Sequence, residues 1–331
     1  MGPETPNATY QVKFLPHLHE LEVVLTLKGL SGPGPVLLAT PTWVPGAYGF
    51  MKYGRDLFNL TATDPATGRS LLLQREGWSA YVVEAISREL QVAFSIHAFD
   101  PAWSDLAGFV DTHQALFLAT RCLFAPEHPG PCRVHYDVPA GWDFHHPAGA
   151  TQVEAHTYDY PSHPALLDSP VVLGEFGRLT RTCGGVPFHF LFLDVAVGFE
   201  ARVEPFLDGV MRLAEACCDV FGSFPFEHFT FIYSCDPRAQ WGLEHANATT
   251  IGLGAEVFID SKAFADGLRV SAHELFHAWN CCRLKPAPLG NPDLLIGCFP
   301  DVLWMTEGFT RYYEFLLCVR SGAIPADTFF S

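Results

Sequence analysis

The stretch His273-Glu274-Leu275-Phe276-His277 places two imidazole rings four residues apart, with a carboxylate next to the first ring. Neither Gly nor Pro stands beside it, so the segment is expected to be helical. Positions i and i+4 share one face of an α-helix, so both rings can reach a single metal ion. Glu274 would then lie close enough to act on a water molecule at that ion. The alternative is a buried helix that carries two of the chain's 15 histidines by chance.

Glu307 is the candidate for a third metal ligand. The segment from Trp304 to Tyr313 indicates the start of a second helix, and Glu307 stands there among apolar and aromatic residues. Two histidines and a glutamate leave one coordination position open for water, which is typical of catalytic rather than structural zinc sites. The alternative is a solvated glutamate that the helix dipole favours in a first turn. We predict a Zn²⁺ site formed by His273, His277 and Glu307.

These motifs resemble those of the gluzincin metallopeptidases, in which His-Glu-x-x-His lies on one helix and Glu-Gly on the next. The segment Gly242-Leu243-Glu244-His245 resembles the aminopeptidase branch of that clan. The long gap between His277 and Glu307, with Trp279-Asn280 after the histidines, is similar to the glycyl aminopeptidase family, metallopeptidase family sixty-one. Weaker similarities to this family occur at Trp43-x-Pro45-Gly46-x-Tyr48, Asp168-Ser169-Pro170-Val171 and Tyr312-Tyr313.

The resemblance implies a fold and an activity. The fold would be α+β, with an N-terminal β-sandwich domain over residues 1–172 and a thermolysin-like (gluzincin) zinc-peptidase domain over residues 173–331. The activity would be zinc-dependent hydrolysis of the N-terminal bond of a peptide substrate with a free N-terminus, with small residues such as Gly or Ala preferred. Glu274 would be the catalytic residue that accepts the water proton and later donates it to the leaving amine.

Glu244 and Gly242 are the substrate-binding residues that the resemblance implies. A carboxylate at Glu244 can hold a free α-ammonium group as an ion pair, which sets the cleavage site one peptide bond away. The alternative is a surface glutamate. The chain departs from the family pattern at Trp241, where the family often has glycine, and a bulky indole there can narrow the substrate site or shift its backbone.

Two more residues are candidates for orienting the metal ligands. Glu314 lies seven residues after Glu307, about two helical turns along the same face, and can accept a hydrogen bond from a zinc-bound imidazole. It can equally be a solvated surface residue. Asn280, shortly after the second histidine, is the other candidate.

The resemblance does not identify the residue that stabilises the tetrahedral intermediate. Related aminopeptidases supply a tyrosine hydroxyl from a region well after the third ligand, whereas this sequence stops at Ser331. We therefore expect a catalytic domain that is truncated and incomplete in its C-terminal helical part.

Composition argues against several other classes of function. The net charge of −16 disfavours nucleic acid and anionic membrane surfaces as partners. No apolar run approaches the length of a transmembrane helix, and the N-terminus lacks a signal-peptide pattern.

The ten cysteines form no regular framework, so we expect reduced thiols and a cytoplasmic location. Cys281 and Cys282 are interpreted as packed thiols rather than metal ligands. Nothing in the sequence indicates an oligomeric state.

Hydrophobic periodicity predicts β-structure in the first half and mixed structure in the second. Residues 89–98 alternate strictly, with Leu90, Val92, Phe94 and Ile96 on one face. Turn-rich stretches separate this strand from further strands predicted at 21–27, 58–63 and 132–138. The second half is predicted to hold strands at 188–193, 229–234 and 248–253 and an amphipathic helix at 200–221.

Three functions are compatible with these residues. The leading one is a zinc aminopeptidase. A zinc endopeptidase is the second, if Glu244 faces solvent. The third is an inactive, zinc-containing module that binds peptides without cleaving them. Metal analysis combined with assays of free and N-blocked peptides separates the three.

Overall fold

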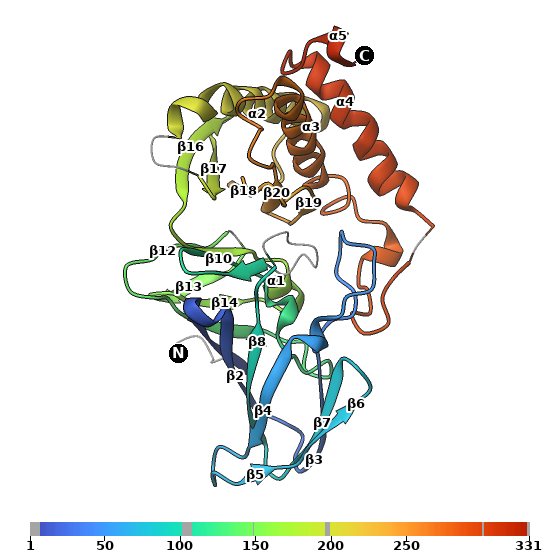
Figure 1. Ribbon diagram of the computed structural model, residues 1–331. Helices are drawn as coiled ribbons and strands as arrows, with labels where there is room; N and C mark the ends of the chain where they lie inside the picture. Colours follow the sequence, from blue (N-terminus) through green and yellow to red (C-terminus); the bar gives the residue numbers. More distant parts are fainter. Residues whose placement is uncertain (1–6, 101–107, 148, 196–198, 300, 330–331) are drawn as a thin grey trace. The chain divides into compact units, whose positions relative to one another are not determined.

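The computed structural model describes residues 7–100, 108–147, 149–195, 199–299 and 301–329. The chain divides into two compact units, Met1–Gly174 with Asp293–Gly297 and Glu175–Pro292 with Cys298–Ser331. Strands dominate the first unit, whereas the second combines a sheet with helices (Figure 1). The predicted α+β class, with a β-rich N-terminal domain, is therefore confirmed.

Three sheets form the first unit within the described ranges. Their strand orders are β13-β14-β11-β1-β2-β8-β4-β5, β12-β15-β10-β9 and β3-β7-β6. The strands are β1 Ala8–Leu15, β2 Glu20–Lys28, β3 Gly34–Ala39, β4 Leu57–Thr63, β5 Ser70–Leu71, β6 Leu73–Glu76, β7 Ala80–Ala85, β8 Glu89–His97, β9 Gly108–Val110, β10 Gln114–Phe117, β11 Cys132–Asp137, β12 Asp143–His145, β13 Thr151–Glu154, β14 Thr157–Tyr160 and β15 Val171–Gly174. Short helices at Pro16–Leu18, Tyr53–Arg55, Ala119–Arg121 and α1 His163–Leu167 connect them.

Side-chain alternation explains why these strands share one core. In β8, the side chains of Leu90, Val92, Phe94 and Ile96 are all buried. Strand β2 runs antiparallel beside β8, which places its alternating apolar residues on the same side of the sheet. Apolar residues of all three sheets pack into a single cluster. The strands predicted at 21–27, 58–63, 89–98 and 132–138 lie at β2, β4, β8 and β11.

The second unit is built on one five-stranded sheet with the order β16-β17-β18-β20-β19. Its elements are β16 Gly177–Cys183, β17 Val186–Leu193, α2 Glu200–Phe221, β18 Phe229–Ser234, β19 Gly242–Glu244, β20 Ala248–Gly252, α3 Ser261–His277, the short helix Ala287–Leu289, the π-helix Trp304–Gly308, α4 Phe309–Arg320 and α5 Ala326–Phe329. Strands β17, β18 and β20 are parallel, and β19 pairs antiparallel with β20 at the edge of the sheet.

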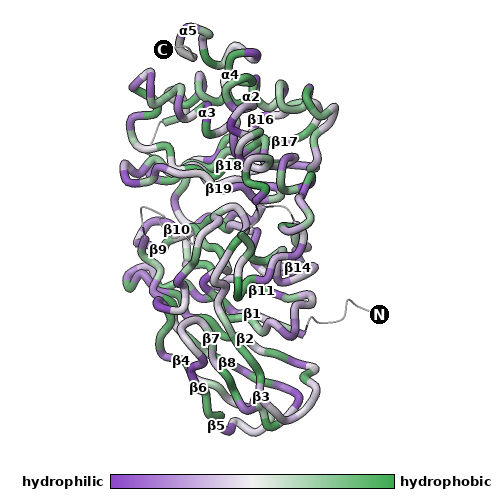
Figure 2. The backbone as a smooth tube through the Cα atoms, turned by 90° about the vertical axis from the view of Figure 1, so that its right-hand side faces the viewer, coloured by the Kyte–Doolittle hydropathy of each residue, from purple (hydrophilic) through white to green (hydrophobic). Residues whose placement is uncertain are grey.

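Helices α2 and α3 cover one face of this sheet (Figure 1). Alternate aromatic residues of β17 and β18, among them Phe190 and Phe231, are buried against the helices. Gly209 of α2 allows the close approach of α3, because a Cβ there would lie 2.7 Å from a methyl group of Leu268. Hydrophobic segments run through the strands of the first unit and the helices of the second (Figure 2). No helix in the described part of the chain is long and apolar enough to cross a membrane.

A buried histidine in the first unit makes its stability depend on pH. His163 stacks on Phe124 with ring centroids 4.4 Å apart, and its ring nitrogens have no hydrogen-bond partner among the described residues. Burial lowers the pKa of His163 to about 4. An unfolded histidine has a pKa of about 6.5, so between these two values the unfolded chain binds a proton that the folded chain does not. Stability must therefore fall as the pH drops through this window.

We predict that His163→Leu removes part of this acid sensitivity. Between about pH 7 and about pH 5, the free energy of unfolding of the wild type should fall by about 2 kcal/mol more than that of the variant. Chemical denaturation at the two pH values measures the difference. His97→Leu, at an exposed position of β8, is the control and should keep the wild-type pH dependence. Equal pH dependence in wild type and His163→Leu would contradict the prediction.

Candidate metal centre

Helix α3 carries the His-Glu-x-x-His motif at its C-terminal end. The helix begins after Asp260, whose side chain accepts a hydrogen bond from the backbone N–H of Ala263 at 2.8 Å and so caps the first turn. Its apolar face, including Leu268, Ala272 and Leu275, is buried against α2 and the sheet. Burial of that face fixes the rotation of the helix, and the two histidines therefore point toward the helix that follows in the chain.

His273, His277 and Glu307 bring three ligand atoms together. The two Nε2 atoms are 3.0 Å apart, and Oε2 of Glu307 lies 3.3 Å from Nε2 of His273 and 3.5 Å from Nε2 of His277. Tetrahedral zinc with bonds of about 2.0–2.1 Å holds its ligand atoms about 3.3–3.4 Å apart. The residues predicted from sequence therefore form a candidate metal site, with ligand atoms close to the spacing of tetrahedral coordination.

Hydrogen bonds at the far side of each ring decide which nitrogen faces the centre. Nδ1 of His273 lies 2.5 Å from Oε2 of Glu314, and Nδ1 of His277 lies 3.0 Å from the carbonyl oxygen of Asn280. Both partners are acceptors, so each Nδ1 carries a proton, and a metal ion at the centre would displace any proton on Nε2 and meet the lone pairs of two neutral rings. The two Nε2 atoms are 3.0 Å apart, so a cation that both can contact, a proton or a metal ion, relieves the repulsion between their lone pairs. This arrangement fits a bound metal ion.

The pKa shifts of these three residues also favour a bound cation. Burial lowers the pKa of His273, but hydrogen bonds to Glu307 and Glu314 outweigh it and raise the pKa to about 9. For His277, burial also lowers the pKa, while Glu244 and Glu307 raise it to about 10. Burial raises the pKa of Glu307, but its contacts with the two histidines dominate and lower it to about 2. The site therefore attracts positive charge, which a divalent cation supplies.

Glu314 and Asn280 connect the histidine helix to the segment that carries Glu307. Glu314 is 1% exposed and also accepts a hydrogen bond from Arg269 at 2.6 Å. The side-chain amide of Asn280 lies 3.0 Å from the carbonyl oxygens of Met305 and Thr306. Glu314 and Asn280, both predicted to orient the metal ligands, thus lie beside the two histidines, whereas no sequence motif pointed to Arg269.

Glu274 faces the same centre. Its side chain is buried, and Oε2 has no hydrogen-bond partner among the described residues. Burial raises its pKa to about 7 against the opposing effect of His273 and His277. A carboxyl group with a pKa near neutrality can both accept and release a proton at physiological pH.

Gly242 and Glu244 lie on β19, the edge strand next to α3. Because side chains alternate along a strand, residues 242 and 244 share a face while Leu243 is buried on the other. A Cβ at position 242 would lie 2.1 Å from Oε1 of Glu274, so only glycine leaves room for that carboxylate. Oε1 of Glu244 lies 3.3 Å from Sγ of Cys281, a contact that no sequence motif predicts.

We predict that His277→Ala abolishes stoichiometric zinc binding, because it removes one ligand and the ring that orders the site. Metal content after zinc loading and dialysis measures the effect. The matched control is His97→Ala, which replaces an exposed histidine of the first unit and should leave metal content unchanged. Failure of the wild type to retain zinc would contradict the assignment, as would full retention by His277→Ala.

We also predict that Gly242→Ala displaces Glu274 without removing the metal ligands. Zinc content should stay normal, whereas the rate of any reaction that uses the Glu274 carboxylate should fall about a hundredfold, the cost of roughly 1 Å of misplacement. The control is Gly130→Ala, because a Cβ at that position meets no atom within 4 Å. Unchanged turnover in Gly242→Ala would show that the close approach does not matter.

Comparison with known proteins identifies a family of metallopeptidases. A family model described as the Peptidase M61 N-terminal domain matches residues 9–175, just over half of the chain, and one described as M61 glycyl aminopeptidase matches residues 266–331. No curated protein matches. Among solved structures, an aminopeptidase N family protein from Idiomarina loihiensis is similar, with a TM-score of 0.84 and 21% identity. The match covers 97% of this chain but 56% of that one, so this chain spans little more than half the length of that relative. The chain belongs to the M61 glycyl aminopeptidase family of metallopeptidases.

Proposed function

We propose that this chain carries the metal centre and the amino-group site of a zinc-dependent aminopeptidase that acts on peptides with a free N-terminus. The observation that supports it most directly is the position of Glu244, an acidic residue on an edge strand beside the zinc-type cluster of His273, His277 and Glu307. Family membership supports the reaction class, and the family's description as glycyl aminopeptidases supports a preference for small residues such as Gly or Ala.

His273, His277 and Glu307 would hold the zinc ion. A bound zinc ion would supply Lewis acidity, which lowers the pKa of water and polarises the carbonyl of the scissile bond. Glu274, with a pKa raised to about 7, accepts the proton of the attacking water and then donates it to the leaving amine. Because one carboxyl group performs both transfers, the reaction needs no second acid.

Glu244 would determine where the peptide is cut. Its carboxylate pairs with the α-ammonium group of the first residue, and the scissile carbonyl, which belongs to that same residue, then lies toward Glu274 and the histidines. Strand β19 is the edge of the sheet, so its backbone can pair with an extended substrate. The ten free cysteines support placing this reaction in a reducing compartment, and we propose the cytoplasm.

Glu274→Gln tests the proton-transfer role. The substitution keeps the size of the side chain but removes its capacity to accept a proton, so zinc should remain bound while turnover falls by about two to four orders of magnitude. Metal analysis and single-substrate kinetics on the same preparation measure both quantities. Near-wild-type turnover in Glu274→Gln would rule out this residue as the base.

Glu244→Ala tests the amino-group site. Loss of a charge pair in the substrate complex should weaken the use of free peptides by about tenfold to a thousandfold, with zinc content unchanged. Acetylation of the peptide N-terminus should impose a similar penalty on wild type and little further penalty on the variant. Binding of free and acetylated peptides gives the same comparison without turnover. Glu256→Ala replaces a glutamate outside the cluster and serves as the matched control.

The same experiment separates the alternatives. Equal cleavage of free and acetylated peptides by the wild type would favour an endopeptidase. Zinc binding together with selective binding of free peptides, but without cleavage, would favour a peptide-binding module. Parallel assays with Gly, Ala, Leu and Phe at the first position test the proposed preference for small residues.

A further inference from the structure

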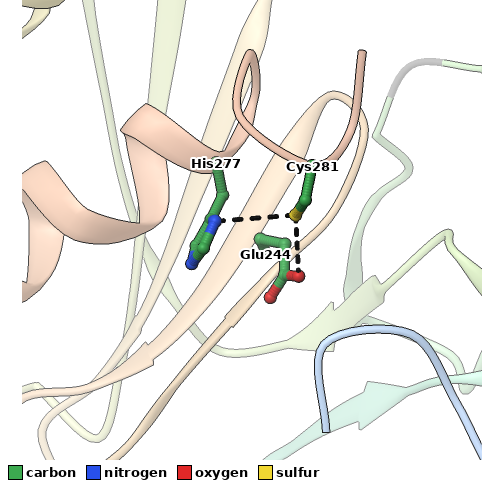
Figure 3. A group of neighbouring side chains, drawn as sticks. All are labelled: Glu244, His277 and Cys281. Carbon is green, nitrogen blue, oxygen red and sulfur yellow. Dashed lines mark hydrogen bonds between the residues drawn. The ribbon is translucent and has the colours of Figure 1, made fainter. Parts of the chain in front are cut away.

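A second group of metal-type ligands lies beside the first. Glu244 from β19, His277 from the end of α3 and Cys281 from the turn after it point toward one another (Figure 3). Sγ of Cys281 lies 3.3 Å from Oε1 of Glu244 and 3.5 Å from Nδ1 of His277. The three ligand atoms lie within 4.8 Å of one another, and both His277 and Cys281 are buried.

The two groups of ligands use different nitrogen atoms of His277. The cluster with His273 and Glu307 is centred on Nε2 of His277, whereas the second cluster is on the Nδ1 side of the same ring. The two clusters therefore lie on opposite edges of one imidazole. A thiolate, an imidazole nitrogen and a carboxylate are ligands that Zn²⁺ accepts, and the thiolate in particular favours softer cations such as Cd²⁺.

The backbone at Cys281 is held in an unfavourable conformation. Its φ angle is +92°, in a region that non-glycine residues rarely adopt. Backbone hydrogen bonds hold the turn in place, from Asn280 N–H to Phe276 at 3.0 Å and from Cys282 N–H to His277 at 3.1 Å. Glycine would satisfy this backbone better than cysteine. A strained residue whose thiol contacts two functional side chains indicates a role for the thiol itself.

We propose that Glu244, Cys281 and Nδ1 of His277 form a second binding site for a thiophilic divalent cation, and that a cation bound there excludes the peptide's amino group from Glu244. Binding removes one proton from the thiol of Cys281 and one from Nδ1 of His277, and both protons go to solvent. It also breaks the hydrogen bond from Nδ1 to the carbonyl oxygen of Asn280. Because of these costs, the second site is weaker than the first and fills after it.

A titration with Cd²⁺ tests the site directly. The protein is first loaded with zinc, and Cd²⁺ is then added while bound metal is measured by equilibrium dialysis and cadmium–thiolate formation by ultraviolet absorption. The wild type should bind a further cation with the absorption of a thiolate complex. Exchange of Cd²⁺ for zinc at the first site gives no such absorption, because that site contains no cysteine.

Cys281→Gly is the informative variant, because it removes the thiol and relieves the positive φ angle, and so should fold. It should retain the first metal and lose both the second cation and the thiolate absorption. Cys282→Ser replaces the neighbouring thiol and should retain both. Absence of thiolate absorption in the wild type would overturn the proposal, and so would an undiminished second cation in Cys281→Gly.

The exclusion of the peptide's amino group from Glu244 rests on the proposed function. Peptide binding measures it separately from cation binding. Bound Cd²⁺ should weaken binding of a free peptide by at least about tenfold and leave an acetylated peptide unaffected. If Cd²⁺ binds through Cys281 but free peptides bind equally well, the metal site stands and the exclusion of the amino group fails. If the wild type binds no zinc at the first site yet shows the Cys281-dependent absorption, the proposed function fails and the second site stands.

Discussion

The candidate metal centre depends on two buried hydrogen-bond networks that tie α3 to the segment carrying Glu307. One is centred on the carboxylate of Glu314, which contacts both Arg269 and His273 of α3. The other is centred on Asn280, whose amide reaches backbone carbonyls of the π-helix. In the sequence, Glu307 lies between the π-helix carbonyls that Asn280 contacts and Glu314. Because a buried charge without its partner is strongly destabilising, the Glu314 network resists any sliding of one helix past the other.

The π-helix at Trp304–Gly308 determines the direction in which Glu307 points. In an α-helix each residue turns by about 100°, so a wider turn changes which side chains face α3. The wider turn also leaves carbonyl groups outside the regular ladder, and the carbonyl of Thr306 accepts hydrogen bonds from Asn280 at 3.0 Å and from Thr310 at 2.5 Å. Glu307, the candidate third ligand, is thus held by an irregular turn that is itself fixed by side chains.

Sequence patterns predicted those features whose residues all lie within a single helix or strand. Helical period predicts that His273 and His277 share a face, and strict alternation predicts β8, because each signal lies within one element. The π-helix and the contact between Cys281 and Glu244 could not be predicted in this way, since they depend on a positive φ angle and on packing between elements distant in sequence. Short strands such as β9 and β12, three residues each, carry too few residues to show a period. Glu244 was identified only through resemblance, because nothing local distinguishes it from a surface glutamate.

Several carboxylates converge around the two histidines, and their surroundings give them different properties. Glu307 contacts both imidazole rings, which keeps its pKa at about 2 and makes it a permanent anion suited to ligation. Glu274 is buried, has one oxygen without a partner among the described residues, and has a pKa of about 7, which suits proton transfer. Two chemically identical groups thus acquire separate roles from burial and neighbours alone.

The two nitrogen atoms of His277 likewise have different surroundings. One nitrogen faces Glu307, and the other faces Asn280 and Cys281. A change on the Nδ1 side of this ring alters the electron density at Nε2, so the thiol of Cys281, which also contacts Glu244, is coupled to the candidate metal centre through a single imidazole.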